Sequence, residues 1–182
     1  KQADTEFVEL NSGFNYSLFY TAAGAGLNDL RLLDVLPYNG GDGRIPASSF
    51  SGTIKYAAPI PNPVASVGPP STVADPNIEI RYSNNTPANI NRDPYDAGHN
   101  LDGTGTNSGS TSNWCTVVQF GGANCPASIG DATAMMALPL FDIGNDLPAD
   151  QTYALQVAID VSGNAIGDVY SNDFVADSPS LG

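Results

Sequence analysis

The stretch that decides the fold of this chain is Tyr153-Ala154-Leu155-Gln156-Val157-Ala158-Ile159-Asp160-Val161. Large apolar residues alternate along it with small or polar ones, so the large side chains share one face at a period of two. This alternation is typical of a β-strand that lies against a core on one side only. The residues predicted to face inward are Tyr153, Leu155, Val157, Ile159 and Val161.

Further strands are predicted by short runs of β-branched and aromatic residues that Gly, Pro, Asn, Asp and Ser separate. The clearest is 14–20, because its aromatic and leucine side chains at every second position share one face. The leucines of 27–36 alone would also fit a helix, but their alternation and the stop at Pro37 favour a strand. The remaining predicted strands are 7–10, 50–57, 77–82, 115–120, 133–140 and 169–176.

This series of strands, with no amphipathic helix among them, predicts an all-β fold, an immunoglobulin-like β-sandwich. We expect a single domain over residues 1–182, with long inserted loops at about 57–76 and 83–114. Connections of that length are either functional or mobile.

The charge of the chain is strongly unbalanced, with 19 acidic against 6 basic residues and a formal net charge of -13. Repulsion from phosphate groups argues against nucleic acid and anionic membranes as partners. No stretch approaches the roughly 20 apolar residues of a membrane span, so we expect no direct membrane insertion. The acidic surface is compatible with divalent cations or basic partners, or it only keeps the protein soluble.

The two cysteines, Cys115 and Cys125, are ten positions apart with two glycines and a proline around them. Such a segment suits closure of a small loop by a disulfide, and there is no second pair of cysteines to complete a zinc site. We therefore expect a disulfide and an oxidising compartment, which means a secreted or cell-surface protein. Two unrelated buried thiols are the alternative.

Short motifs near the start of the chain follow one another in a characteristic order. They are Lys1-Gln2-Ala3-Asp4, the turn Asn11-Ser12-Gly13, the strand through Tyr16 and the box Asp34-Val35-Leu36-Pro37. In this order they resemble the bacterial surface-repeat family known as domain of unknown function eleven, whose members have a lysine, a turn glycine, a "tYtitv" strand and a "D-x-L-P" box. The spacing of fifteen positions between Lys1 and Tyr16 agrees with that layout.

The C-terminal part is similar to the same family. Residues 147–151 resemble its "l-x-p-g-x" turn before the penultimate strand, and 169–175 resemble its final "i-x-N-t-A-x-V" strand. The cysteine loop at 114–126 looks like that of a longer subtype, while 38–113 match only loosely. The resemblance implies an immunoglobulin-like sandwich that serves in tandem as a stalk or adhesin module, with neighbouring modules of the same protein or filament as partners.

Similar immunoglobulin-like surface modules form an intramolecular isopeptide bond, in which a first-strand lysine attacks a last-strand asparagine beside a buried acid. The resemblance makes Lys1, Asn172 and Asp34 the corresponding candidates. Burial would make the lysine nucleophilic, and it would keep the carboxyl protonated so that the carboxyl polarises the asparagine carbonyl and shuttles the proton. The alternative is a solvated lysine, a turn asparagine and a strand-end or capping aspartate.

The second long loop holds the other candidate binding residues. Asp93, Asp96 and Asp102 offer oxygen ligands of the kind calcium uses, although their spacing does not reproduce the calcium-loop motif. Tyr95 and Trp114 are candidates for a surface that binds a glycan or a host protein. For Trp114 the alternative is packing on a disulfide in the core.

Sequence motifs for catalysis are missing. The single histidine, His99, has no cysteine or serine motif near it and is predicted to be a surface loop residue. Neither G-x-S-x-G, nor H-E-x-x-H, nor a phosphate-binding glycine loop occurs, so we expect no enzyme and no cofactor apart from calcium. The sequence predicts a structural or adhesive module of an exported bacterial cell-surface protein. The alternative is a carbohydrate-binding or calcium-dependent adhesion module.

Overall fold

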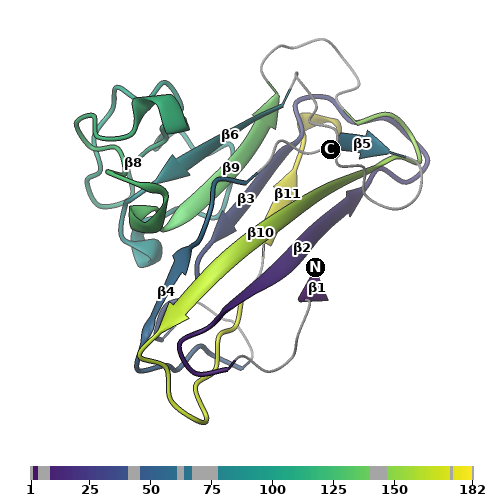
Figure 1. Ribbon diagram of the computed structural model, residues 1–182. Helices are drawn as coiled ribbons and strands as arrows, with labels where there is room; N and C mark the ends of the chain where they lie inside the picture. Colours follow the sequence, from purple (N-terminus) through teal and green to yellow (C-terminus); the bar gives the residue numbers. More distant parts are fainter. Residues whose placement is uncertain are drawn as a thin grey trace.

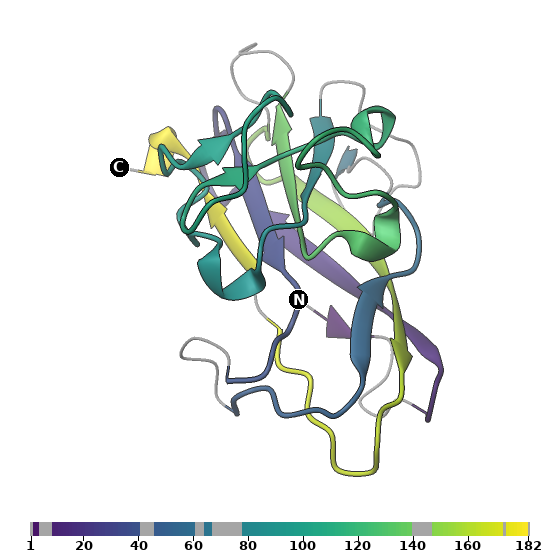
Figure 2. The ribbon, with the colours of Figure 1, turned by 90° about the vertical axis from the view of Figure 1, so that its left-hand side faces the viewer.

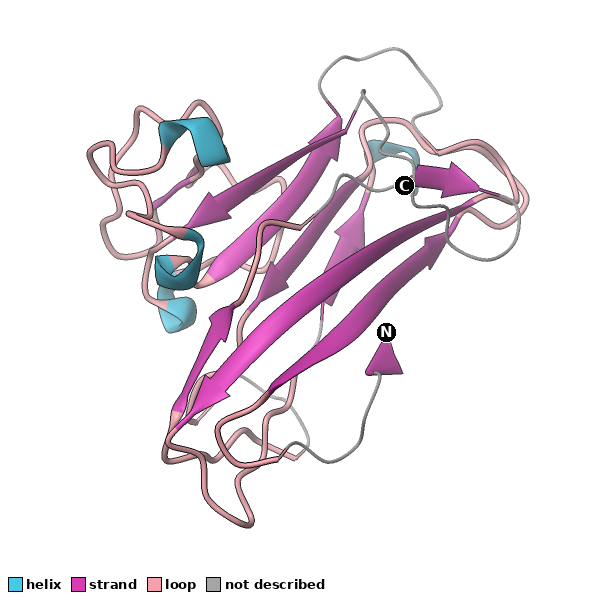
Figure 3. Ribbon diagram, in the orientation of Figure 1, coloured by secondary structure: helices cyan, strands magenta, loops and turns pink. Residues whose placement is uncertain are grey.

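The computed structural model describes residues 2–3, 9–40, 46–60, 64–66, 78–139, 147–172 and 174–181. In these ranges the chain forms two antiparallel sheets packed face to face (Figure 1), which confirms the predicted all-β sandwich. Within the described residues, helical structure is limited to short 3-10 turns (Figure 3). None of the helices in the described ranges has the length and apolar character needed to cross a membrane.

The first sheet is built around a long antiparallel pair of strands that lie far apart in the sequence. Its order is β1-β2-β10-β4, and β5 pairs with the start of β10. The strands are β1 (Gln2–Ala3), β2 (Gly13–Thr21), β4 (Thr53–Tyr56), β5 (Val64–Ser66) and β10 (Thr152–Ser162). The pairing of β2 with β10 extends along the whole of β2.

The inward face of β10 is the one that its alternation predicts. All five of the residues predicted to face inward are buried, with at most 3% of their surface exposed. Burial of each large apolar side chain stabilises the fold by roughly 1.5–3 kcal/mol, so this strand anchors the core. On the neighbouring strand β2, Tyr16 and Leu18 are buried on the same face of the sheet, as their period-two positions predict.

The second sheet has the order β11-β3-β9-β6. Its strands are β3 (Arg31–Val35), β6 (Ile78–Ser83), β9 (Ala134–Pro139) and β11 (Phe174–Asp177). Met135 and Ala137 of β9 face the core between the sheets, whereas Ala134 and Met136 belong to a second apolar cluster on the outer face. A strand covered on both faces reads as a continuous apolar run, as β9 does.

Residues 84–133 form an ordered insert that covers this outer face (Figure 2). It contains a parallel pair, β7 (His99–Asn100) and β8 (Ser112–Asn113), and most of the 3-10 turns. These turns are η1 (Pro87–Asn89), η2 (Val117–Gln119) and η3 (Ile129–Asp131), while η4 (Pro179–Leu181) lies near the C-terminal end.

Three of the predicted strands differ from the structure. Residues 115–120 do not form a strand but contain η2, because Thr116 and Gln119 cap one another in a box that starts a helical turn. The last strand starts at Phe174 rather than near 169, since Val169 makes only an isolated bridge with Ser49. Of the predicted strand 7–10, Glu9 and Leu10 lie in a turn region rather than a strand, and residues 7–8 lie outside the described residues, as does much of the predicted loop at 57–76.

Candidate functional site

Asp34 is a fully buried acid between the two sheets. Its neighbours Leu32 and Leu36 pack in the core between the sheets, whereas Leu33 and Val35 pack beneath the insert. The period of two therefore directs the Asp34 side chain toward the first sheet, where it is 0% exposed. Burial of a carboxylate is costly unless hydrogen bonds satisfy its oxygens.

Both oxygens of the Asp34 carboxyl accept hydrogen bonds. The hydroxyl of Tyr16, on β2, donates to Oδ2 at 2.5 Å, and the Asn172 amide nitrogen donates to Oδ1 at 3.0 Å. The hydroxyl of Tyr56, on β4, lies 3.5 Å from the backbone oxygen of Asp34. The site therefore joins β2 and β4 of one sheet to β3 and the approach to β11 of the other.

Asn172 is held by its backbone neighbours. The Ser48 hydroxyl bonds both the backbone nitrogen and the backbone oxygen of Ser171, and Phe174 pairs with Asp34 across β11 and β3. The side-chain oxygen of Asn172 is buried and has no hydrogen-bond partner among the described residues. An unsatisfied buried carbonyl costs about 1–3 kcal/mol, so such a group needs an explanation, of which a role in chemistry is one.

Of the three isopeptide candidates, the structure brings Asp34 and Asn172 together, and Lys1 lies outside the described residues. Gln2, the residue bonded to Lys1, pairs with Ser17, and Ala3 pairs with Tyr16. The backbone that follows Lys1 therefore runs beside the part of β2 that reaches Asp34. One detail differs from the expected chemistry, because Asp34 contacts the amide nitrogen of Asn172 rather than its carbonyl oxygen.

The two tyrosines of the site remain proton donors over the ordinary pH range. Burial raises the pKa of Tyr16 well above its usual value of 10.0, and the nearby Asp34 charge raises it further. The same two causes, in the same order, raise the pKa of Tyr56. Tyr16 was not among the predicted site residues, although its position on the inward face of 14–20 was a signal that could have indicated it.

The predicted disulfide is confirmed. Cys115 and Cys125 are joined, with their Cα atoms 5.7 Å apart. Cys115 also exchanges two backbone hydrogen bonds with Tyr82, both 2.8 Å long, at the outer edge of β6. The bridge therefore fastens the loop around η2 to the second sheet.

Loss of this bridge is expected to reduce the free energy of unfolding by about 3 kcal/mol, the chain-entropy value for a loop of this size. The double variant Cys115→Ser, Cys125→Ser and the reduced wild type should show the same loss in urea denaturation followed by circular dichroism. An unchanged denaturation midpoint in both would contradict the prediction.

The three calcium candidates lie in separate local turns. Asp93 accepts the backbone N–H of Tyr95, Asp96 that of Gly98 and Asp102 that of Thr104, at 2.7–2.8 Å. Each carboxylate thus closes a turn with the residue two positions later. The described ranges contain no group of three or more His, Cys, Asp or Glu side chains placed to hold a metal ion.

The two aromatic candidates for a binding surface have packing roles. Trp114 is 0% exposed and belongs to the outer apolar cluster, so its ring offers no surface to a ligand. Tyr95 is half-buried, with the Arg31 guanidinium 4.1 Å from the centre of its ring and its hydroxyl bonded to the backbone oxygen of Asp29. Both residues fasten the insert to the second sheet.

His99 is buried, and its prediction as a surface loop residue is wrong. The Trp114 indole N–H donates to Nδ1 of His99 at 3.0 Å, and Nε2 lies 2.9 Å from the backbone oxygen of Asp93. These contacts require a neutral ring with its proton on Nε2, since Nδ1 must accept. Tertiary contacts between residues fifteen positions apart leave no sequence signal of their own.

Acidification is expected to weaken the insert through His99. Burial lowers the pKa of His99 below its usual 6.5, so an unfolded chain takes up the proton at a higher pH than the folded chain does. The contribution of neutral His99 to the free energy of unfolding is therefore complete above pH 6.5. It is lost as the pH falls from 6.5 toward the lowered pKa of the folded state. Protonation would also place a second donor opposite the Trp114 N–H.

The test compares wild type with His99→Gln, which stays neutral, in urea denaturation at pH 5 and pH 7.5. Wild type should lose more stability than the variant between these two values. Trp114 is the single tryptophan of the chain, so its fluorescence reports directly on the contact. Parallel pH profiles of the two proteins would refute the role of His99.

Buried asparagines also hold the insert together, which its polar composition did not reveal. The Asn85 amide nitrogen lies within 3.1 Å of the backbone oxygens of Gly109 and Thr111 and 3.0 Å from the Ser112 hydroxyl. Asn113 is fully buried and accepts the backbone N–H of Gly105 at 2.9 Å. Side-chain amides here replace the ladder bonds of regular structure.

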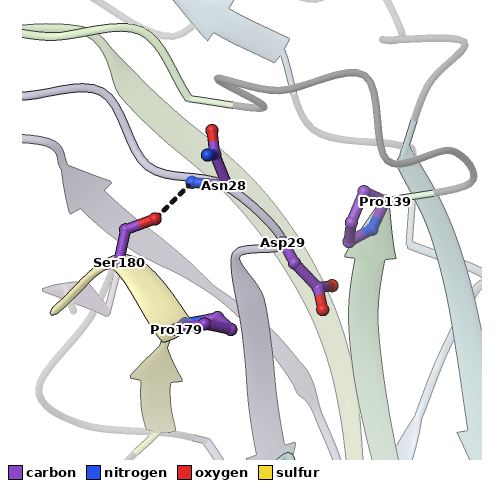
Figure 4. A pocket seen from close by; sticks show the side chains of 5 residues that line it. All are labelled: Asn28, Asp29, Pro139, Pro179 and Ser180. Atoms are coloured by element: carbon purple, nitrogen blue, oxygen red, sulfur yellow. Dashed lines mark hydrogen bonds between the residues drawn. The ribbon is translucent and has the colours of Figure 1, made fainter. Parts of the chain in front are cut away.

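A shallow pocket lies near the C-terminal end of the described chain (Figure 4). It is lined by Asn28, Asp29, Pro139, Pro179 and Ser180. The Ser180 hydroxyl accepts the backbone N–H of Asn28 at 3.1 Å, which ties η4 to the start of the second sheet. The Ser180 hydroxyl is thus engaged in a backbone contact within the pocket.

Comparisons of the chain with family models, with curated proteins and with solved structures find no match. The resemblance of the two flanks to the surface-repeat family therefore remains a prediction from the sequence.

Proposed function

We propose that this chain is a structural or adhesive module of an exported bacterial cell-surface protein, and that an isopeptide bond between Lys1 and Asn172 ties its ends together. The observation that carries the proposal is the buried pair of Asp34 and Asn172, whose amide oxygen has no hydrogen-bond partner in the described part of the chain. The disulfide between Cys115 and Cys125 supports export, since such bonds persist in oxidising compartments.

The residues fit the chemistry of this bond. The Lys1 ammonium gives a proton to the Asp34 carboxylate, and the neutral amine attacks Cγ of Asn172. The bond from Cγ to Nδ2 breaks, Asp34 protonates the departing nitrogen, and the second proton of the amine leaves with it as ammonium. Asp34 lies 3.0 Å from that nitrogen, which is within reach for the transfer.

The proposed bond has a mechanical consequence. It would join the residue before β1, in the first sheet, to the residue two positions before β11, in the second sheet. Tension applied to the two ends would then run through one covalent link, and the strands between would stay folded. A stalk or adhesin on a cell envelope needs this resistance.

The intact mass of the purified chain, before and after reduction, tests the proposal. A deficit of about 17 Da, the ammonia lost in the condensation, is expected in wild type and should be absent from Lys1→Arg and Asn172→Ala. Fragmentation should place the cross-link between the peptides that contain residues 1 and 172. A wild-type chain of full mass, apart from the 2 Da of the disulfide, would refute the bond.

A further inference from the structure

The proton that Asp34 receives must reach one of two oxygens, and only one of them faces Asn172. Oδ1 lies 3.0 Å from the Asn172 amide nitrogen, and Oδ2 lies 2.5 Å from the Tyr16 hydroxyl. We infer that Tyr16 is a positioning residue that holds Oδ2 and directs the proton of Asp34 to Oδ1. This inference rests on the proposed isopeptide function.

The Tyr16 hydroxyl acts as a fixed donor rather than as a proton source. Tyr16 is 3% exposed. Because β2 is paired along its whole length with β10, the backbone that carries the Tyr16 ring is held in place. The raised pKa of its hydroxyl keeps the proton on the tyrosine. A proton on Oδ2 would compete with this donor, whereas a proton on Oδ1 leaves the bond from Tyr16 intact.

Protonation of Oδ1 also explains how the Asn172 carbonyl becomes polarised. An ionised carboxylate only accepts, so it takes the amide N–H as the structure shows. Once Oδ1 carries a proton, a half-turn of the amide about its Cβ–Cγ bond brings the carbonyl oxygen against that O–H. The buried amide oxygen, unsatisfied among the described residues, then gains a donor, and Cγ becomes more electrophilic. After the amine has attacked, the reverse turn in the tetrahedral intermediate returns Nδ2 to Asp34, which protonates it as it leaves.

Packing alone does not require a hydroxyl at this position. Phe14 lies two residues earlier on the same face of β2, with its ring centre 6.3 Å from that of Tyr16, and has no polar group. Loss of the Tyr16 hydroxyl also takes a donor from the buried Asp34 carboxyl and costs stability, so the rates are compared on protein shown to be folded.

The experiment needs a defined start of the reaction, because the bond is irreversible once formed. Full-length chain with a photocaged lysine at position 1 is purified, illuminated, and sampled over time for the loss of about 17 Da. Wild type is compared with Tyr16→Phe and with the matched control Tyr82→Phe. The Tyr82 hydroxyl is also buried, but it accepts the backbone N–H of Ile60 at 2.7 Å.

Tyr16→Phe should slow the bond by about tenfold or more, since a hydrogen bond to a charged group is worth at least that factor. Tyr82→Phe should keep the wild-type rate. The analogue 4-aminophenylalanine at position 16 restores an N–H donor on the same ring, so it should recover most of the rate. In the Lys1→Arg background, the side-chain amide signals of Asn172 in NMR spectra should shift with Tyr16→Phe and stay in place with Tyr82→Phe.

The outcomes separate the inference from the proposed function. If wild type never loses 17 Da after illumination, the isopeptide proposal itself fails. If wild type reacts and Tyr16→Phe reacts equally fast, only the role of Tyr16 is overturned. A folded 4-aminophenylalanine variant that reacts far more slowly than wild type would also overturn it, and this arm does not depend on the folding of Tyr16→Phe.

Discussion

Asn172→Ala is expected to lower the free energy of unfolding by about 5 kcal/mol, the chain-entropy value for a cross-link that closes a loop of this length. The proposed bond would connect residues 1 and 172 of a 182-residue chain, so it would restrict the unfolded state more than the disulfide does. Lys1→Arg should cause a similar loss while it keeps the positive charge. Urea denaturation followed by circular dichroism measures both.

The double variant Lys1→Arg, Asn172→Ala distinguishes a shared bond from two independent contacts. With a shared bond, the double variant is no less stable than the weaker single variant, because the second change removes nothing more. Asn164→Ala is the matched control, since the Asn164 amide oxygen accepts the backbone N–H of Asn11 at 2.8 Å on the exposed side of the sandwich. It should cost about 1 kcal/mol. Additive losses for the Lys1 and Asn172 changes would argue against the bond.

Trp114→Ala is expected to cost about 3–5 kcal/mol, the range for truncation of a buried large aromatic residue. Trp114 is the largest fully buried side chain, and it packs with Leu33 and Met136 where the insert covers the second sheet. Its removal also takes the N–H partner from His99. We expect the insert to loosen before the sandwich does.

Hydrogen exchange followed by mass spectrometry separates local loosening from global loss. Peptides from 84–133 should exchange faster in Trp114→Ala, while peptides from β2 and β10 keep most of their protection. Trp114→Phe, which keeps an aromatic ring but not the N–H, should fall between wild type and the alanine variant. Uniform loss of protection over both regions would show that the insert and the sandwich unfold as one unit.

The regular strands were predictable because their residues obey a local rule. In β2 and β10 each large apolar residue occupies an alternate position, and burial follows from that period alone. The pattern fails at residues 115–120. There the apolar pair Val117 and Val118 suggested a strand, but a capping box and a disulfide impose a turn that exposes both side chains.

The candidate site was predictable in part. The order of motifs along the chain selected Asp34 and Asn172, and the structure places them in contact. The motif order gave no indication of which atoms of Asp34 and Asn172 meet, because the orientation of a side-chain amide depends on its neighbours in space. The role of Tyr16 likewise required the opposing sheet, since β2 and β3 belong to different layers.

Period-two alternation, turn residues and cysteine spacing were enough to establish the sandwich class and the disulfide, since each depends on residues close together along the chain. The insert was decided only by tertiary structure. Its hydrophilic composition suggested an open loop, yet buried asparagines and the hydrogen bond between His99 and Trp114 hold it together. The rings of Trp114 and Tyr95 fasten it to the second sheet. Those contacts join residues that no local pattern relates, and their geometry exists only once both layers have formed.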